Sequence, residues 1–221
     1  MMRPTEMIRS PRRHATPMAG AALAALALTL AGCASPPSSF YTLTDTSGVA
    51  TSGSATTGAN APAAPYAIEV SPVAVPEQVD RPQIVVTRGG GRVDILEESR
   101  WAAPLKNELT STISRDLTQR LGAMDVYGLP RADGLAVYRV STSVQRFESA
   151  PGEQAALTAV WSVRRVPGEI VLTCRFAGTE PASGGVTEVV AAQRRLVDRL
   201  ADGIGNAIAT SAQGATPRCQ G

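Results

Sequence analysis

Few side chains in this sequence combine reactive chemistry with an informative position. The chain has three cysteines, Cys33, Cys174 and Cys219, and a single histidine, His14. A cysteine sulfur can be alkylated, form a disulfide or bind a metal, and a histidine can act as a base or a metal ligand. Cys33 is the most informative of the four, because it ends the tetrapeptide Leu-Ala-Gly-Cys directly after an apolar segment. The residues around Cys33 therefore indicate which chemistry its sulfur undergoes.

The first 32 residues have the order of a bacterial secretory signal. Four arginines come first, and the apolar segment 18–30 that follows is too short to span a bilayer. Small residues precede Cys33, as signal cleavage requires, and the tetrapeptide resembles the lipobox of bacterial lipoproteins. We predict cleavage before Cys33 and attachment of lipid, with acyl chains such as palmitate, to its sulfur. A plain signal peptide with an incidental cysteine is the alternative.

Cleavage before Cys33 leaves a mature chain with little catalytic potential. His14 is lost with the signal, so no imidazole remains for a Ser-His-Asp triad or for zinc. Cys174 and Cys219 alone do not make a tetrahedral metal site. In an oxidising periplasm they can form one disulfide between the C-terminal tail and a strand, or both can stay free. We predict no catalytic residue, no metal site and no cofactor, and therefore a protein that is not an enzyme.

The charge balance argues against a nucleic-acid partner. The full chain has 21 basic and 19 acidic residues, and the signal takes four arginines and Glu6 with it. The mature part then holds 17 basic against 18 acidic residues, a net charge of −1. A nucleic-acid binder needs a basic patch that replaces counterions.

The periodicity of apolar residues predicts an α+β fold, in which an antiparallel sheet is packed by two long amphipathic helices. One helix is expected where apolar residues recur every four positions, and its stripe is Trp101, Leu105, Leu109, Ile113, Leu117 and Leu121. A second helix is expected over 186–210. There, Gly203 and Gly205 either weaken the helix by roughly 1 kcal/mol each or permit close packing on the sheet. Strands are expected at 66–75, 83–87, 92–97, 124–127, 135–147, 155–166 and 169–176, and a loop at 178–185.

These elements divide the chain into a signal peptide (1–32), a lipidated N-terminus with a flexible linker (33–65), an α+β domain (66–212) and a tail (213–221). Residues 45–65 are almost wholly Thr, Ser, Gly, Ala, Asn and Pro, so they bury too little apolar surface to offset the entropy of ordering. Such a linker reaches roughly 25 Å on average and lets the domain stand off from the membrane. An insertion of no mechanical importance is the alternative.

Three further features each have a functional and a structural interpretation. The glycines at 89–91 suit a hairpin turn better than a phosphate-binding loop, because the spacing and the lysine of such a loop are missing. The pairs Arg164–Arg165 and Arg194–Arg195 can bind phospholipid headgroups or simply be exposed. The apolar helix stripes can line a lipid groove, although packing against the sheet is the commoner use.

A set of short motifs after Cys33 resembles the PqiC-type (YmbA) lipoproteins, the auxiliary component of ABC-type lipid transporters. Three pieces carry the resemblance in order along the chain. They are Phe40-Tyr41-Thr42-Leu43, then Val73-x-Val75-Pro76 with Val79-Asp80-Arg81-Pro82-Gln83-Ile84-Val85 and Arg88, and finally Arg100-Trp101-Ala102-x-Pro104-Leu105. The resemblance covers about residues 40–210, and the long segment between Leu43 and Tyr66 departs from the family pattern.

The resemblance implies a Gram-negative lipoprotein on the periplasmic face of the outer membrane. Its implied partners are an inner-membrane protein with MCE domains, the associated permease and ATPase, and outer-membrane lipid. Ala34 and Ser35 agree with outer-membrane sorting, since the inner-membrane retention signal has Asp directly after the cysteine. The motif residues Asp80, Arg81, Pro82, Arg88, Arg100 and Trp101 are then candidate partner contacts. Asp80 and Arg81 can alternatively pair with Arg100 or Glu98 inside the fold.

The leading hypothesis is a non-enzymatic docking subunit that tethers an MCE-type conduit to the outer membrane, with homo-oligomer formation through an exposed edge strand as a further expectation. The alternative is a periplasmic carrier that binds lipid itself. The third hypothesis is a membrane-anchored hydrolase, and the loss of the histidine with the signal peptide argues against it.

Overall fold

The computed structural model describes residues 36–44 and 64–219. The predicted signal peptide, Cys33 and most of the predicted flexible linker lie outside the described residues. The folded unit begins at Ser38. Within the described part of the chain, no helix has both the length and the apolarity needed to cross a bilayer.

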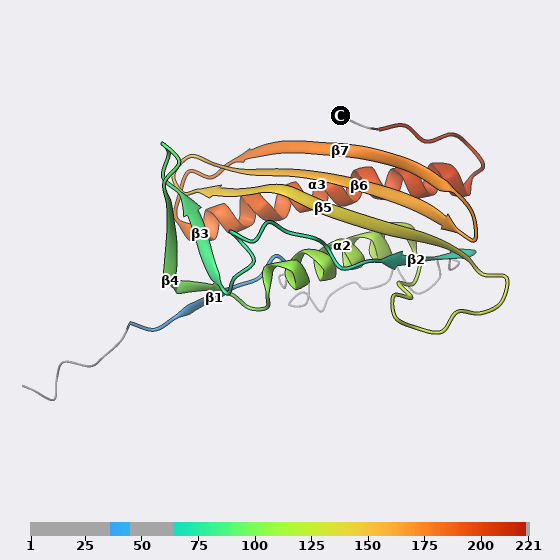
Figure 1. Ribbon diagram of the computed structural model, residues 1–221, viewed down its shortest axis with the longest axis horizontal. Coiled ribbons are helices and arrows are strands. Elements are labelled where there is room, and N and C mark those ends of the chain that lie inside the picture. The colour runs from blue at the N-terminus through green and yellow to red at the C-terminus, as the bar shows by residue number, and fades with distance from the viewer. Residues whose placement is uncertain (1–35, 45–63, 220–221) are drawn as a thin grey trace, which may run out of the picture. The chain divides into compact units, whose positions relative to one another are not determined.

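A four-stranded sheet forms the main layer of the fold, in the order β2-β5-β6-β7 (Figure 1). The bounds of these strands are β2 Tyr66–Val70, β5 Ala136–Ala150, β6 Gln154–Val166 and β7 Ile170–Pro181. Neighbouring strands β5, β6 and β7 are antiparallel, whereas β2 is parallel to β5. On β5, Tyr138, Val140 and Val144 are buried, and they share one face because side chains alternate along a strand.

Two helices cover one face of this sheet: α2 (Leu105–Leu121) and α3 (Val186–Ala212) (Figure 1). Each helix turns an apolar stripe to the interior, because residues four apart lie on one side of a helix. The stripe residues Leu105, Leu109, Ile113 and Leu117 of α2 and Leu196, Leu200, Ile204 and Ile208 of α3 are all in the core. Gly122 ends α2 in the left-handed conformation, with φ 61°.

A second, three-stranded sheet has the order β1-β4-β3, with bounds β1 Ser39–Tyr41, β3 Gln83–Thr87 and β4 Val93–Trp101. β3 and β4 form an antiparallel hairpin, and β1 lies parallel to the end of β4. Trp101 joins the two sheets, since its ring meets Phe147 of β5 edge to face at a centroid distance of 6.1 Å. Both sheets therefore share one hydrophobic core.

The predicted α+β fold with two long helices is confirmed, while several details differ. The strands form two mixed sheets rather than one antiparallel sheet. Trp101 belongs to β4, because Pro104 stands outside the helix as its N-cap and α2 begins only at Leu105. A strand was expected over 124–127, but Asp125 makes only an isolated bridge with Ile68. β7 extends to Pro181, so it includes part of the loop expected over 178–185.

The folded unit includes residues that precede 66, the predicted start of the α+β domain. β1 pairs with β4, and Leu43 is completely buried in the core. A three-residue strand of this kind depends on its partner rather than on its own pattern. The segment 45–63 consequently connects two strands of the same domain, so its length does not set the distance between Cys33 and the domain.

The C-terminal tail returns along β7 after α3 ends (Figure 1). Cys219 of the tail is bonded to Cys174 of β7, across 45 residues of chain that contain α3. The disulfide thus closes a loop around the helix that covers the sheet.

The two glycines of α3 have different neighbours. A Cβ at Gly205 would lie 2.5 Å from Arg120 Cδ and 3.5 Å from Leu117 Cδ2, so this glycine permits close approach of α2 rather than packing on the sheet. A Cβ at Gly203 would meet only Trp161, at 3.8 Å, which is ordinary van der Waals contact.

Candidate functional site

The motif residues around β3 and β4 hold this hairpin in place. The N–H of Trp101 donates to the carbonyl of Pro82 (2.8 Å), and the Trp101 ring is buried. Asp80 lies 3.5 Å from Lys106 at the start of α2, so it pairs with neither Arg100 nor Glu98. These contacts fix the loop before β3 to the entry of α2.

The three motif arginines do not converge on one place. Arg88 donates to Asp94 (2.8 Å) beside the hairpin turn, whereas Arg100 donates to the carbonyl of Glu97 (3.0 Å) at the other end of β4. Arg81 has a buried Nε atom without a hydrogen-bond partner. The motif therefore contributes intramolecular contacts at several points instead of one open site.

A buried acid binds the segment that follows β1. Glu108, only 6% exposed, accepts hydrogen bonds at Oε2 from the Thr42 hydroxyl (2.8 Å) and the Leu43 N–H (3.0 Å). Its Oε1 accepts a third from the Ala103 N–H (3.1 Å). Glu108 lies in the first turn of α2, where a carboxylate is also favoured by the helix dipole. A single side chain thus attaches the N-terminal segment to the helix layer.

Arg194 of α3 holds the same segment from the other side. Its Nη1 donates to the Leu43 carbonyl (2.6 Å), while its Nε and Nη2 pair with Asp198 (2.8 Å) and Asp116 (3.2 Å). We call the set Thr42, Leu43, Glu108 and Arg194 the N-terminal clamp. Because Arg194 is committed to three partners, it is not available as the headgroup-binding residue considered from the sequence.

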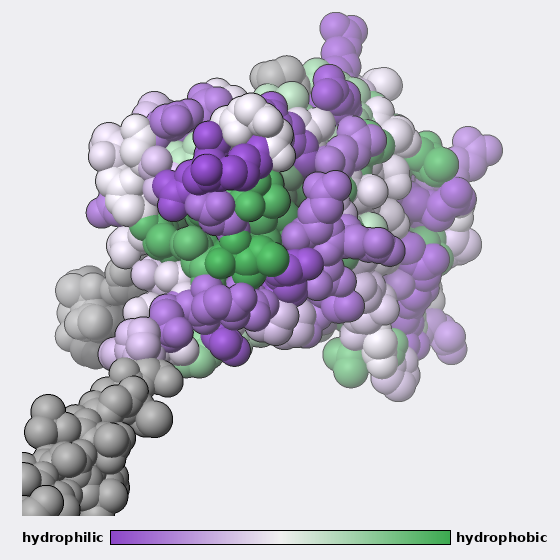
Figure 2. Space-filling model, turned by 60° about the vertical axis from the view of Figure 1, so that its left-hand side comes forward, coloured by the Kyte–Doolittle hydropathy of each residue, from purple (hydrophilic) through white to green (hydrophobic). Residues whose placement is uncertain are grey.

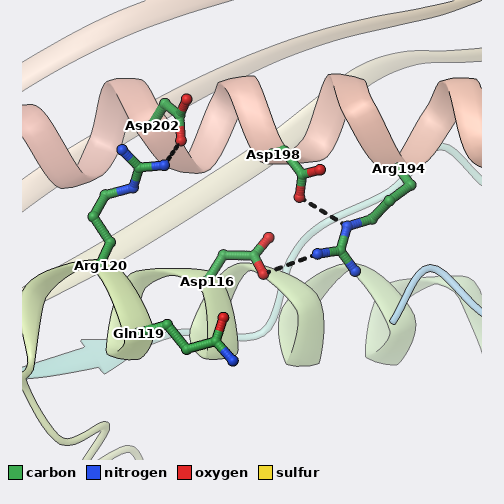
Figure 3. Close-up of a pocket in the computed structure, with 6 residues that line it drawn as sticks. All are labelled: Asp116, Gln119, Arg120, Arg194, Asp198 and Asp202. Atoms are coloured by element: carbon green, nitrogen blue, oxygen red, sulfur yellow. Dashed lines mark hydrogen bonds and ion pairs between the residues drawn. The ribbon is translucent and has the colours of Figure 1, made fainter. Parts of the chain in front are cut away.

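The clamp continues into a charged groove between α2 and α3, of about 420 Å³, in which Asp116 and Asp198 both point toward Arg194 (Figure 3). Burial raises the pKa of Asp116 from 3.8 to about 6, a hydrogen bond with Asp198 adds to the rise, and the Arg194 charge partly opposes it. Farther along the groove Arg120 pairs with Asp202 (Figure 3). Acids and arginines paired in this way join the two helices.

The groove holds little that could perform a reaction. Its lining consists of three aspartates, two arginines and Gln119, with no nucleophile beside a base. Among the residues that the structure describes, no cluster of three or more His, Cys, Asp or Glu side chains could hold a metal ion. The arrangement is suited to holding the N-terminal segment and both helices together.

Glu108 and Arg194 were not identified from the sequence as residues that bind the N-terminal segment. Glu108 resembles any acid in a first helical turn, and its partners lie 65 and 66 residues away in the sequence. The sequence did contain one indication that Glu108 is buried. Glu108 stands three positions after Leu105, so both side chains lie on the side of α2 that faces the core.

The fold and the clamp define a compact α+β domain whose extreme N-terminal segment is fixed into its core. Residues 41–205 match the model of the ABC-type transport auxiliary lipoprotein component family. The chain belongs to this family, and so it is an auxiliary lipoprotein of ABC-type transport. No curated protein sequence matches it significantly.

Two solved structures show the same fold. The crystal structure of an uncharacterized protein is 18% identical, with a TM-score of 0.60, and the match covers 78% of this chain and 99% of that chain. A protein from Xanthomonas campestris is 20% identical, with a TM-score of 0.54, over 67% of this chain and 87% of that chain. At these identities the similarity concerns the fold alone.

Proposed function

We propose that the protein is a docking subunit of an MCE-type ABC lipid transport system, of the PqiC type, and is attached to the periplasmic face of the outer membrane through lipid on Cys33. The observation that carries the proposal is the N-terminal clamp. It fixes Thr42 and Leu43, which follow Cys33 by nine and ten residues, directly to both helices. A pull on the anchor is therefore transmitted to the core rather than to a loose linker, as a tether requires.

The sorting and the membrane attachment follow from the same short segment. Ala34 and Ser35 after Cys33 support outer-membrane sorting, because neither is the aspartate of the inner-membrane retention signal. A Cys33→Ser variant expressed without its partners should move from the membrane to the soluble fraction. A variant that sediments with membranes as completely as the unmodified protein would refute the lipid anchor.

The end of the domain away from β1 is where we place the contact with the MCE-domain protein. The loop between α2 and β5 exposes three large apolar side chains, Met124, Tyr127 and Leu129. β5 begins beside this loop and ends near Trp101, and its 15 residues span roughly 45 Å (Figure 1). The two ends can therefore face a membrane and a partner at the same time.

Co-purification tests the proposal. The mature lipoprotein, purified from detergent-solubilised membranes, should recover a protein with MCE domains together with its permease and ATPase. Met124→Asp combined with Leu129→Asp should reduce this recovery at least about tenfold, since two carboxylates buried unpaired in an apolar contact would together cost more than about 1.4 kcal/mol. Phe40→Asp, a comparably exposed apolar position in β1 at the other end, is the matched control and should keep it. Purification that never recovers an MCE-domain protein refutes the docking role.

The alternative, a carrier that binds lipid itself, finds no support in the helix stripes. The apolar residues that would line a lipid groove, such as Leu109, Ile113 and Leu200, are used in the core. Mass spectrometry of the purified domain should accordingly find no bound phospholipid, and stoichiometric lipid would favour the carrier.

A further inference from the structure

The outer face of the β3–β4 hairpin exposes apolar side chains that the core does not use. Val93 is 56% exposed and Ile95 is 42% exposed, and Val85 of β3 pairs directly with Ile95, so the three side chains share one face. Figure 2 shows an apolar patch on this side of the molecule, surrounded by hydrophilic residues. We call Val85, Val93 and Ile95 the hairpin patch. Patches of this kind mark contact surfaces when they are grouped and rimmed by charge.

The turn beside the patch has a surplus of positive charge. Arg88 and Arg92 share one carboxylate, that of Asp94, at 2.8 Å and 3.5 Å, so the turn carries a net charge of +1. The Arg92 side chain is 70% exposed. Guanidinium groups beside apolar residues suit a phospholipid surface, where phosphates lie directly above the acyl chains.

The chain itself brings this face close to a membrane. Five residues separate Cys33 from Ser39, the first residue of β1, and the six Cα-to-Cα steps between them span at most about 20 Å when fully extended. β1 then lies beside β4, the strand that carries Val93 and Ile95. A lipid on Cys33 would therefore hold the β1-β4-β3 sheet next to the bilayer.

We propose that the hairpin patch rests on the lipid surface in which the protein is anchored, with its apolar side chains among the headgroups and Arg88 and Arg92 on lipid phosphates. This proposal depends on the lipid anchor of the proposed function. A second copy of the chain is a poorer occupant. A symmetric contact through the same patch would bring the two arginine pairs toward each other, and like charges facing each other disfavour association.

Depth-dependent fluorescence quenching tests this orientation in the mature, lipidated protein. An added cysteine is the single reactive thiol if Cys33 is lipidated and Cys174 is bonded to Cys219, so Ile95→Cys can carry an environment-sensitive nitrobenzoxadiazole label. Tyr127→Cys, exposed at the other end, is the matched control. The vesicles contain phosphatidylethanolamine and phosphatidylglycerol with brominated acyl chains. We expect at least about twofold quenching at position 95 and almost none at position 127.

A second measurement does not depend on the label. Val93→Asp combined with Ile95→Asp in the unlipidated Cys33→Ser protein should weaken binding to the same vesicles by roughly tenfold or more, because a lost apolar contact of about 1.4 kcal/mol is a tenfold change. Both positions are exposed, so the fold should tolerate the change, and circular dichroism checks this.

The outcomes separate the two proposals. If the lipidated protein stays on vesicles but position 95 is as little quenched as position 127, the hairpin contact is refuted and the anchor stands. If the mature protein does not sediment with vesicles at all, the anchor is refuted and the orientation falls with it. Quenching that disappears when the protein is diluted on the membrane would show contact between copies and would also refute the proposal.

Discussion

The two sheets of this domain are held in the molecule by different kinds of interaction. The four-stranded sheet is covered by two helices whose apolar stripes are fully buried, so many interchangeable contacts stabilise it. The three-stranded sheet also buries Ile84, Val86 and Trp101 in this core, but its first strand, β1, has no fully buried residue and is followed directly by the segment bound to the Glu108 carboxylate. Distributed apolar packing tolerates small changes, whereas a buried charge with three donors depends on one side chain. The segment that follows β1 is thus the one most sensitive to a single substitution.

Glu108→Ala should produce the largest loss. It leaves the Leu43 and Ala103 N–H groups buried without an acceptor, so we expect a decrease of roughly 4 kcal/mol in the free energy of unfolding. Hydrogen exchange should show β1 amides opening before those of β6. Glu188→Ala, an exposed acid in the first turn of α3, is the matched control and should change stability by less than about 0.5 kcal/mol. Equal exchange in both sheets would contradict the difference between them.

Loss of the Cys174–Cys219 disulfide should destabilise the four-stranded sheet. Cys219→Ser opens the 45-residue loop that holds α3 over β7, and the expected decrease is about 3 kcal/mol. The fluorescence of Trp161 in β6 should report it, with Trp101 replaced by Phe so that a single tryptophan remains. Reductant should lower the melting temperature of the unmodified protein and leave that of Cys219→Ser unchanged. A reductant effect that persists in the variant would exclude this pair as its cause.

The ionisation of Asp116 makes the stability of the contact between α2 and α3 depend on pH. Because its pKa is raised to about 6, the folded protein keeps a proton that the unfolded chain releases, and this contribution to stability is complete below about pH 4 and lost as pH rises through 6. Asp116→Asn mimics the protonated form, so at pH 7.5 it should raise the free energy of unfolding by on the order of 1–2 kcal/mol. Urea unfolding at pH 5 and 7.5 measures it.

The matched control for this change is Asp202→Asn in the exposed pair with Arg120, which should alter stability by less than about 1 kcal/mol. A loss of stability in Asp116→Asn at pH 7.5 would mean that the ion pair with Arg194 outweighs the cost of burial.

The glycines of α3 give the smallest expected effect. Gly203→Ala should stabilise the protein by up to about 1 kcal/mol, since its Cβ meets Trp161 at an ordinary distance and alanine favours helix. Gly205→Ala must displace Arg120 and should gain less or lose stability. Thermal unfolding of the two variants measures the difference, and equal gains would show that Arg120 moves aside freely.

The sequence was sufficient for the elements that carry a long periodic signal. Both helices, their buried stripes and the paired strands β5 and β6 follow from apolar residues at helical or alternating spacing. Pro104 and Gly122 mark the ends of α2 for local steric reasons.

The contacts between distant segments could not be read in the same way. β1 has three residues and no period of its own, so only its partner β4 defines it. The parallel pairing of β2 with β5 depends on how the chain returns after α2, which no local pattern specifies. For Glu108, the sequence shows a charged residue but not the two N–H groups that make its burial favourable.

The path of the chain from β1 to β2 has a consequence for proteolysis. A protease that cut between residues 45 and 63 would sever every covalent connection between Cys33 and the rest of the domain. With the lipid anchor that we propose on Cys33, release from the membrane would then require the β1–β4 hydrogen bonds and the N-terminal clamp to open. The nicked protein should remain at the membrane as a two-chain complex and leave it at a rate set by local unfolding of a few residues.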